Sequence, residues 1–263
     1  MAIPVLRPLS TIAYNTIRLN DSVHKAKKLV ICCAPSSLSN LVGSEAATVV
    51  ESLRWLMVFL GDNMLCLLLI LYGALWAEKD VNPALFSCEL MANASRFVED
   101  EEVNYDPRSL IRKAHAATTS IGVVAMLETN GILKIASVGD CGVRVIRKGQ
   151  IIFSTSPQEH YFDCPYQLSS EAIGQTFLDA TVTTVELMEE DTVVMGSDGL
   201  FDNVFDREII SIVSSCDNVS DAAKALANLA YNHSKDSSFE SPYSQEARTQ
   251  VESLMILLLL LGR

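Results

Sequence analysis

The chain has 263 residues, a mass of 28.8 kDa and a formal net charge of −12 at neutral pH. This length suits one sizeable domain preceded by a leader. The strong negative charge argues against nucleic acid as a partner, because binding of a phosphate backbone needs clustered Lys and Arg. Seven cysteines form no CxxC pair, which indicates reduced thiols in an intracellular compartment rather than a disulfide framework.

Residues 1–43 have the composition of an organelle transit peptide. They contain one acidic residue, Asp21, and five basic ones, and they are rich in Ser, Thr and Ala. Such a leader is a targeting signal and not a folded element. The sequence ICCA at 31–34 is similar to a chloroplast processing site. We therefore expect a chloroplast transit peptide over 1–43, with the mitochondrion as the alternative destination.

Residues 44–75 are the least regular part of the chain. The stretch 53–75 is very apolar, and Gly61-Asp62-Asn63 interrupts it. The charge-free run from 63 to 77 is shorter than the about 20 apolar residues of a membrane-spanning helix, so membrane anchoring is not favoured. Neither a helical nor a strand period is evident. We interpret 44–75 as an irregular apolar insert, of the kind that translated intron sequence would produce.

From Trp76 onward the pattern is regular. Helices are predicted over 83–96, 107–117, 206–215 and 220–233, with Asp106 and Ser220 as N-caps. Hairpins are predicted for 123–128 with 132–137, around Asn130-Gly131, and for 143–146 with 150–153. Residues 180–187 read as a further strand. Hairpins between flanking helices predict an α+β fold, a sandwich of two antiparallel sheets with helices outside.

A short buried strand over 192–195 leads into Gly196-Ser197-Asp198-Gly199. A carboxylate that follows a buried strand and is flanked by glycines can reach a cleft while the backbone approaches a ligand closely. Hard cations such as Mg²⁺ and Mn²⁺ prefer oxygen ligands of this kind. The alternative is that Asp198 only caps a turn, because Asp-Gly is common turn chemistry. The residues alone leave both readings open.

Several separate stretches resemble the metal-dependent type 2C serine/threonine phosphatases (PPM family). SDGLFDNV at 197–204 resembles their aspartate motif, and SVGDCGVRV at 137–145 resembles their Val-Gly-Asp signature. Longer stretches at 78–96, 158–170 and 239–248 resemble the organellar branch of the family. The resemblance implies an α-β-β-α sandwich over residues 76–250. It also implies metal-dependent hydrolysis of phosphoserine and phosphothreonine on chloroplast proteins, including thylakoid and photosystem II core proteins.

The resemblance also assigns residues. The family uses a two-metal site for Mg²⁺ or Mn²⁺, in which the cations activate a water for attack on phosphorus. By position in the motifs, Asp198 would bind the second catalytic metal and Asp140 a third, weaker one. Asp202 would support the same site, and Gly73 could supply a metal-binding carbonyl. The expected partners are phosphorylated proteins, and the chain is expected to be a monomer. His160 is expected to pack or orient rather than to catalyse.

The chain departs from the family pattern at three places. No Gly-Glu-Asp occurs upstream, the motif aspartate before Trp76 is missing, and residues 251–263 form an aberrant apolar tail without the C-terminal aspartate. A single Asp holds hydrated Mg²⁺ weakly. The alternative function is therefore a catalytically inactive phosphatase-like fragment or binding module.

Overall fold

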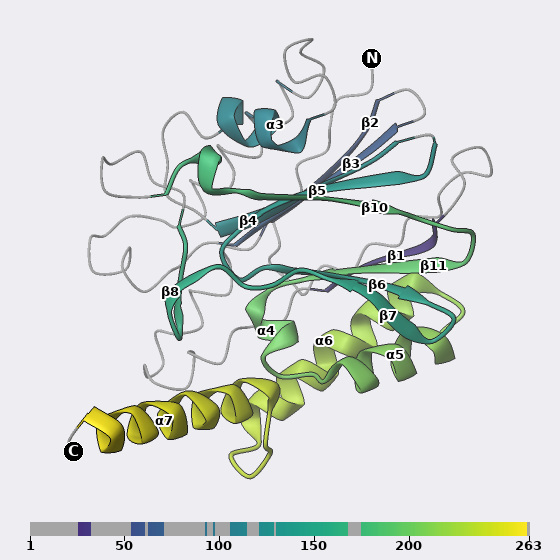
Figure 1. Cartoon of the computed structure of the whole chain (residues 1–263). Coiled ribbons are helices and arrows are strands. Elements are labelled where there is room, and N and C mark those ends of the chain that lie inside the picture. The colour runs from purple at the N-terminus through teal and green to yellow at the C-terminus, as the bar shows by residue number, and fades with distance from the viewer. Residues whose placement is uncertain are drawn as a thin grey trace, which may run out of the picture.

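The computed structural model describes residues 26–32, 54–60, 63–70, 93, 97, 106–114, 121–128, 130–167 and 175–261. Two β-sheets pack face to face (Figure 1). Helix α3 (Pro107–Ala114) lies outside one sheet, and helices α5 (Asp206–Ser215) and α6 (Val219–Lys235) lie outside the other. The expected α-β-β-α sandwich is therefore confirmed.

We call the four-stranded sheet the first sheet and the five-stranded sheet the second. The first has the order β1 (Ala26–Cys32), β11 (Asp191–Gly196), β6 (Gly142–Arg147), β7 (Gln150–Ser154). The second has the order β10 (Thr181–Glu186), β5 (Ile132–Val138), β4 (Ile121–Leu127), β3 (Asn63–Ile70), β2 (Arg54–Leu60). Within both sheets neighbours pair antiparallel except β1 and β11, which are parallel. The expectation of purely antiparallel sheets is wrong at that pair.

Alternation along the strands builds two layers of core. Successive side chains of a strand point to opposite faces, so β6 and β11 bury one set against the second sheet and the other against the helices. The inter-sheet layer includes Val143, Val145, Val193 and Met195 of the first sheet and Val123, Ala125, Leu133 and Ile135 of the second. The helix layer includes Ile146 and Val194 packed with Ile209, Val213, Leu226 and Ala227. The first sheet is thus covered on both faces.

Most elements predicted beyond Pro107 are present. Both hairpins form, and the Asp106 carboxylate caps α3 by accepting from the Ser109 backbone N–H at 2.9 Å. The cap predicted at Ser220 is wrong, because α6 begins one residue earlier, at Val219. The helix predicted over 83–96 falls largely outside the described residues.

The interpretation of 44–75 as an irregular insert is wrong for its two apolar runs. They form β2 and β3, which pair with each other, and β3 also pairs with β4 inside the second sheet. A continuous apolar run has no period that separates a strand from a helix. The useful signal was the spacing, because Gly61 and Asp62 separate the runs by two residues, as in a tight hairpin. Likewise β1 is a folded strand within the predicted leader.

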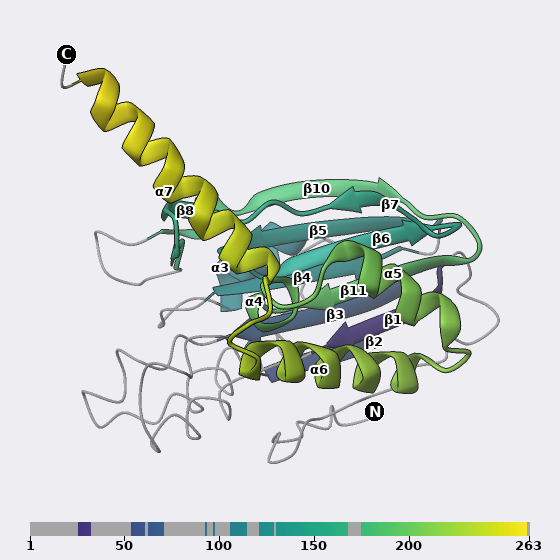
Figure 2. The ribbon, with the colours of Figure 1, turned by 90° about the horizontal axis from the view of Figure 1, so that it is seen from below.

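The last described helix, α7 (Pro242–Leu261), crosses the expected boundary at 250 and includes most of the apolar tail. It leads away from the sheets in both views (Figures 1 and 2). Among the helices that the structure describes, none is long and apolar enough to cross a membrane.

Candidate functional site

Two aspartate-bearing turns meet at one end of the first sheet. Gly142 at the start of β6 is opposite Gly196 at the end of β11. Asp140 lies two residues before Gly142, and Asp198 lies two residues after Gly196 and begins α4 (Asp198–Phe201). Because β6 and β11 are antiparallel, both aspartates leave the sheet at the same end. The sheet register therefore brings together the two carboxylates that the separate motifs indicated.

The carboxylates at this end raise one another's pKa. Burial, reinforced by the negative charge of Asp198, raises the pKa of Asp140 to about 8. Burial also raises the pKa of Asp198, although the Gly199 N–H donates to its Oδ1 at 2.7 Å and opposes the shift. The pKa of Asp202 lies well above its usual range, through burial and then the charges of Asp198 and Asp140. The three predicted carboxylates thus form one electrostatic cluster.

Two further acids, which the motifs did not indicate, belong to the same cluster. Glu159 and Asp163 lie in a small hairpin formed by β8 (Glu159–Tyr161) and β9 (Cys164–Pro165). The charge of Asp163 acts on Asp140, Asp198 and Asp202, and burial together with that charge raises the pKa of Glu159. No spacing rule in the sequence signals this approach, because it depends on where the hairpin docks.

Tyr243 at the start of α7 holds the hairpin against the site. Burial and the charge of Asp163 raise the pKa of its hydroxyl, and its ring lies 5.3 Å from that of Phe162. Its backbone N–H donates to the Asp202 carbonyl at 3.1 Å. The turn that carries Asp140 is tied to the same hairpin, because the Gln158 N–H donates to the Gly139 carbonyl at 2.9 Å. Hairpin, α4 and α7 are therefore one connected unit.

His160 lies in this hairpin and packs as expected. Its ring is 4.7 Å from the ring of Tyr166, and its Nε2 is 3.0 Å from Nε2 of Gln175. These contacts agree with the packing or orienting role predicted from the sequence.

A second histidine supports the turn after α4. His233 Nδ1 lies 2.7 Å from the Asn203 carbonyl oxygen, and its ring stacks on Phe239 at 3.7 Å between centres. The buried Asn203 side chain in turn donates to the Gly199 carbonyl at 3.0 Å. The Asp198–Asp202 turn is therefore held to α6 through Asn203 and His233.

The donor chemistry suits a hard divalent cation, since the clustered carboxylates repel one another and a cation would offset that repulsion. The count of donors is incomplete. Among the described residues, no three His, Cys, Asp or Glu side chains converge closely enough to hold a metal ion. Asp140 and Asp198 could supply two ligand oxygens, and Gly73, the fourth predicted metal residue, lies outside the described part of the chain. The residues fit a cation only in part.

No family model matches the chain. A rice (Oryza sativa subsp. japonica) relative, Probable protein phosphatase 2C 1, is 69% identical over 179 residues, which are 66% of this chain and 54% of the relative. Probable protein phosphatase 2C 26 of Arabidopsis thaliana is 48% identical over 274 residues, covering 95% of this chain and 89% of the relative. The chain thus spans about half the length of the first relative and most of the second.

A solved structure is also similar. The X-ray structure of the photosystem II phosphatase PBCP is 58% identical and superposes with a TM-score of 0.74. The match covers 78% of this chain and 82% of that chain.

Proposed function

Because the chain belongs to the protein phosphatase 2C family, we propose that it is a metal-dependent phosphatase that hydrolyses phosphoserine and phosphothreonine in proteins. The observation that carries the proposal is the register of β6 and β11, in which Gly142 is paired with Gly196. Asp140 lies two residues before Gly142, and Asp198 lies two residues after Gly196, at the same end of the sheet. Residues from two separate family motifs meet there, as a site for cations and a phosphoryl group requires.

The acidic residues of this chain would supply the negative charge that binds the cations. Asp198 and Asp140 would hold Mg²⁺ or Mn²⁺, which when bound would neutralise charge on the phosphoryl oxygens and activate a water. The Gly199 N–H keeps one Asp198 oxygen directed along the α4 turn. Asp202 adds a further acid close to Asp198 and Asp140, and Asp163 contributes charge from the hairpin.

The substrates that we propose are phosphoproteins of the chloroplast, including those of the photosystem II core. Support comes from the 58% identity to the photosystem II phosphatase PBCP and from the basic, acid-poor leader at 1–43. Fusion of residues 1–51 to a fluorescent protein tests the location. Fluorescence in plastids is expected, and fluorescence confined to the cytosol, the secretory pathway or mitochondria would contradict the proposal.

A second function is favoured by the incomplete donor set. In the described residues no three acidic, His or Cys side chains form a metal-holding group, and the motif aspartate before Trp76 is missing. A protein with this site could bind a phosphoprotein without turning it over. Loss of even a supporting group around a metal costs about 10–100-fold in affinity or activity, so the loss of direct ligands would cost more.

One assay separates the two functions. The full chain, its Asp198→Asn variant and a variant with the family's missing segments restored are each given Mn²⁺ and a phosphothreonine peptide. Phosphatase function predicts Mn²⁺-dependent turnover that D198N abolishes. The binding-module function predicts turnover by the restored chain only, with the natural chain no faster than D198N. Absence of turnover in all three would reject the phosphatase proposal.

A further inference from the structure

The ring of Phe201 lies across the place where β6 and β11 end together. A Cβ built on Gly142 would lie 2.5 Å from Phe201 Cε2, and one built on Gly196 would lie 3.2 Å from the same atom. The ring therefore rests on the backbone of both strands, in space that a side chain at Gly142 would fill. These contacts are two residues after Asp140 and two residues before Asp198. Phe201 thus contacts both strand ends that lead to Asp140 and Asp198.

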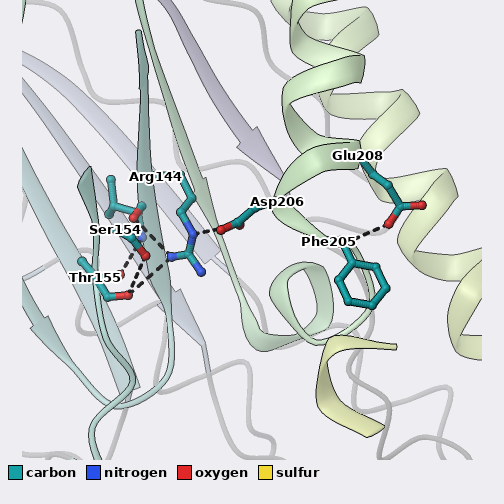
Figure 3. Close-up of polar contacts among 7 residues, drawn as sticks. Arg144, Ser154, Thr155, Phe205, Asp206 and Glu208 are labelled. Carbon is teal, nitrogen blue, oxygen red and sulfur yellow. Dashed lines mark hydrogen bonds and ion pairs between the residues drawn. The ribbon is translucent and has the colours of Figure 1, made fainter. Parts of the chain in front are cut away.

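Arg144 covers this ring. It follows Gly142 by two residues on β6 and so points to the same face of the sheet. Its Cζ lies 4.3 Å from the centre of the Phe201 ring. Its Nε donates to Asp206 Oδ1 at the start of α5, at 3.2 Å. Figure 3 shows the guanidinium between Asp206 on one side and Thr155 on the other. One side chain therefore joins β6, α4 and α5.

The segment after β7 completes the contact. Arg144 Nη1 lies 3.4 Å from the carbonyl oxygens of Val143 and Thr155. The Thr155 N–H donates to the Val143 carbonyl at 3.1 Å, and the Val143 N–H donates to Thr155 Oγ1 at 2.9 Å. These two hydrogen bonds fix Val143, and with it the start of β6 directly after the Asp140 turn, against Thr155.

The exposed fractions of the two side chains indicate which contact of Arg144 matters most. The Asp206 side chain is 51% exposed, so the ion pair contributes little to overall stability. The Arg144 side chain is 15% exposed, and its planar guanidinium can stack flat on a ring, which an ammonium group cannot do. The main effect of Arg144 is therefore local and acts on the placement of the Phe201 ring.

We propose that Arg144 is a positioning residue that holds Phe201 across the Gly142–Gly196 pair and so sets the spacing of the Asp140 and Asp198 carboxylates. The consequence for cation binding rests on the proposed function. The effect of Arg144 on the placement of α4 does not depend on that function.

The first test is amide hydrogen exchange of the metal-free full chain. The Asp202 N–H donates to the Asp198 carbonyl at 2.7 Å, and the Val204 N–H to the Leu200 carbonyl at 2.9 Å. Arg144→Met should speed exchange at both amides about ten-fold, through loss of the ring stack. Arg248→Met is the matched control, because it also removes an arginine charge, but the ion pair of Arg248 with Glu240 is exposed on both sides and contributes little to stability. Unchanged exchange in R144M would overturn the proposal.

A double variant tests the route through the ring. Phe201→Leu removes the ring but keeps apolar bulk. If Arg144 acts through Phe201, adding R144M to F201L should change exchange no further, whereas additive effects would overturn this route. Should R144M fail to fold, Arg144→Lys replaces it with the same expectations, because Lys keeps the charge near Asp206 without the planar stack.

The second test is calorimetric titration with Mn²⁺ alone. R144M should bind Mn²⁺ several-fold more weakly than the natural chain, and R248M should bind as the natural chain does. Equal affinity in R144M, together with altered exchange, would overturn the link between Arg144 and carboxylate spacing. If the natural chain binds no Mn²⁺, the proposed function fails, and the exchange experiment still decides whether Arg144 places α4.

Discussion

Asp191 shows how a single carboxylate is stabilised inside this fold. Its side chain has no exposed surface. Arg147 donates to its two oxygens at 2.8 and 2.7 Å, and the Met188 N–H donates at 2.8 Å. Burial alone would raise the pKa of Asp191, but these hydrogen bonds and the Arg147 charge outweigh it, so the pKa is lowered. At the other end of β11, Asp198 has a raised pKa, and its cluster contains no such cation among the described residues.

We expect Asp191→Asn to lower the free energy of unfolding by about 3 kcal/mol at pH 7, because Arg147 loses its charged partner. A lowered folded-state pKa means that the stabilisation is complete above the unfolded value, about 3.9, and is lost as pH falls through the folded value. Urea unfolding should therefore show a gap between natural chain and D191N that is constant from pH 7 to about 5 and narrows below about 4. A gap that widens with acid would contradict this.

The exposed pair of Glu240 and Arg248 supplies the control. Their side chains are 60% and 57% exposed, so water and salt screen the interaction. Glu240→Gln should leave the unfolding midpoint unchanged.

At the scale of elements, β3 is the strand on which the second sheet depends. It pairs on one side with β2 and on the other with β4, so its backbone hydrogen bonds hold two neighbours. Leu67 lies mid-strand, opposite Leu56 and Val124. Without β3, nothing would join β2 to β4, and the second sheet would open between them. The apolar run is therefore structural and not an addition to the fold.

Leu67→Pro should destabilise the chain by about 3 kcal/mol or more, since proline removes a ladder hydrogen bond and is excluded from central strands. Thermal unfolding by circular dichroism measures the change. Arg54→Pro is the control, because Arg54 is the first residue of edge strand β2, where proline is tolerated. If L67P were as stable as R54P, β3 would not be part of the folded sheet.

The two hairpins show which parts of the fold the sequence could predict. Asn130-Gly131 and the turn before Gly149 carry local turn chemistry, and both hairpins form. The β2–β3 hairpin was missed because its strands are uniformly apolar, so their alternation is invisible. In the site, Asp140 and Asp198 were found because each lies in a recognisable motif. Asp163 was missed because its hairpin is held by contacts that are distant in the chain, including the contact of Phe162 with Tyr243, which lies 80 residues after Asp163.

At the scale of the whole molecule, the site lies at one end of the first sheet, where α4, α7 and the small hairpin come together. The first sheet supplies the two turns, α4 and α7 supply Asp202 and its hydrogen-bond partner, and the small hairpin supplies Asp163. The second sheet provides the opposite wall of the inter-sheet core, and neither it nor α3 supplies any of the five acids. The carboxylates are therefore placed by long-range packing, and small changes at the helix-covered face of the first sheet should reach them first.

The parallel pairing of β1 with β11 has a consequence for maturation. Residues 31–34, the predicted processing site, overlap the end of β1, and Cys32 lies opposite Gly196. A protease that cut after this site would release β1 and leave β11, the strand that leads to Asp198, at an open edge. Its outward N–H and C=O groups would then be available to an added strand from another polypeptide. Removal of the leader would in this way move the free edge of the first sheet from β1 to β11, the strand that leads into the site.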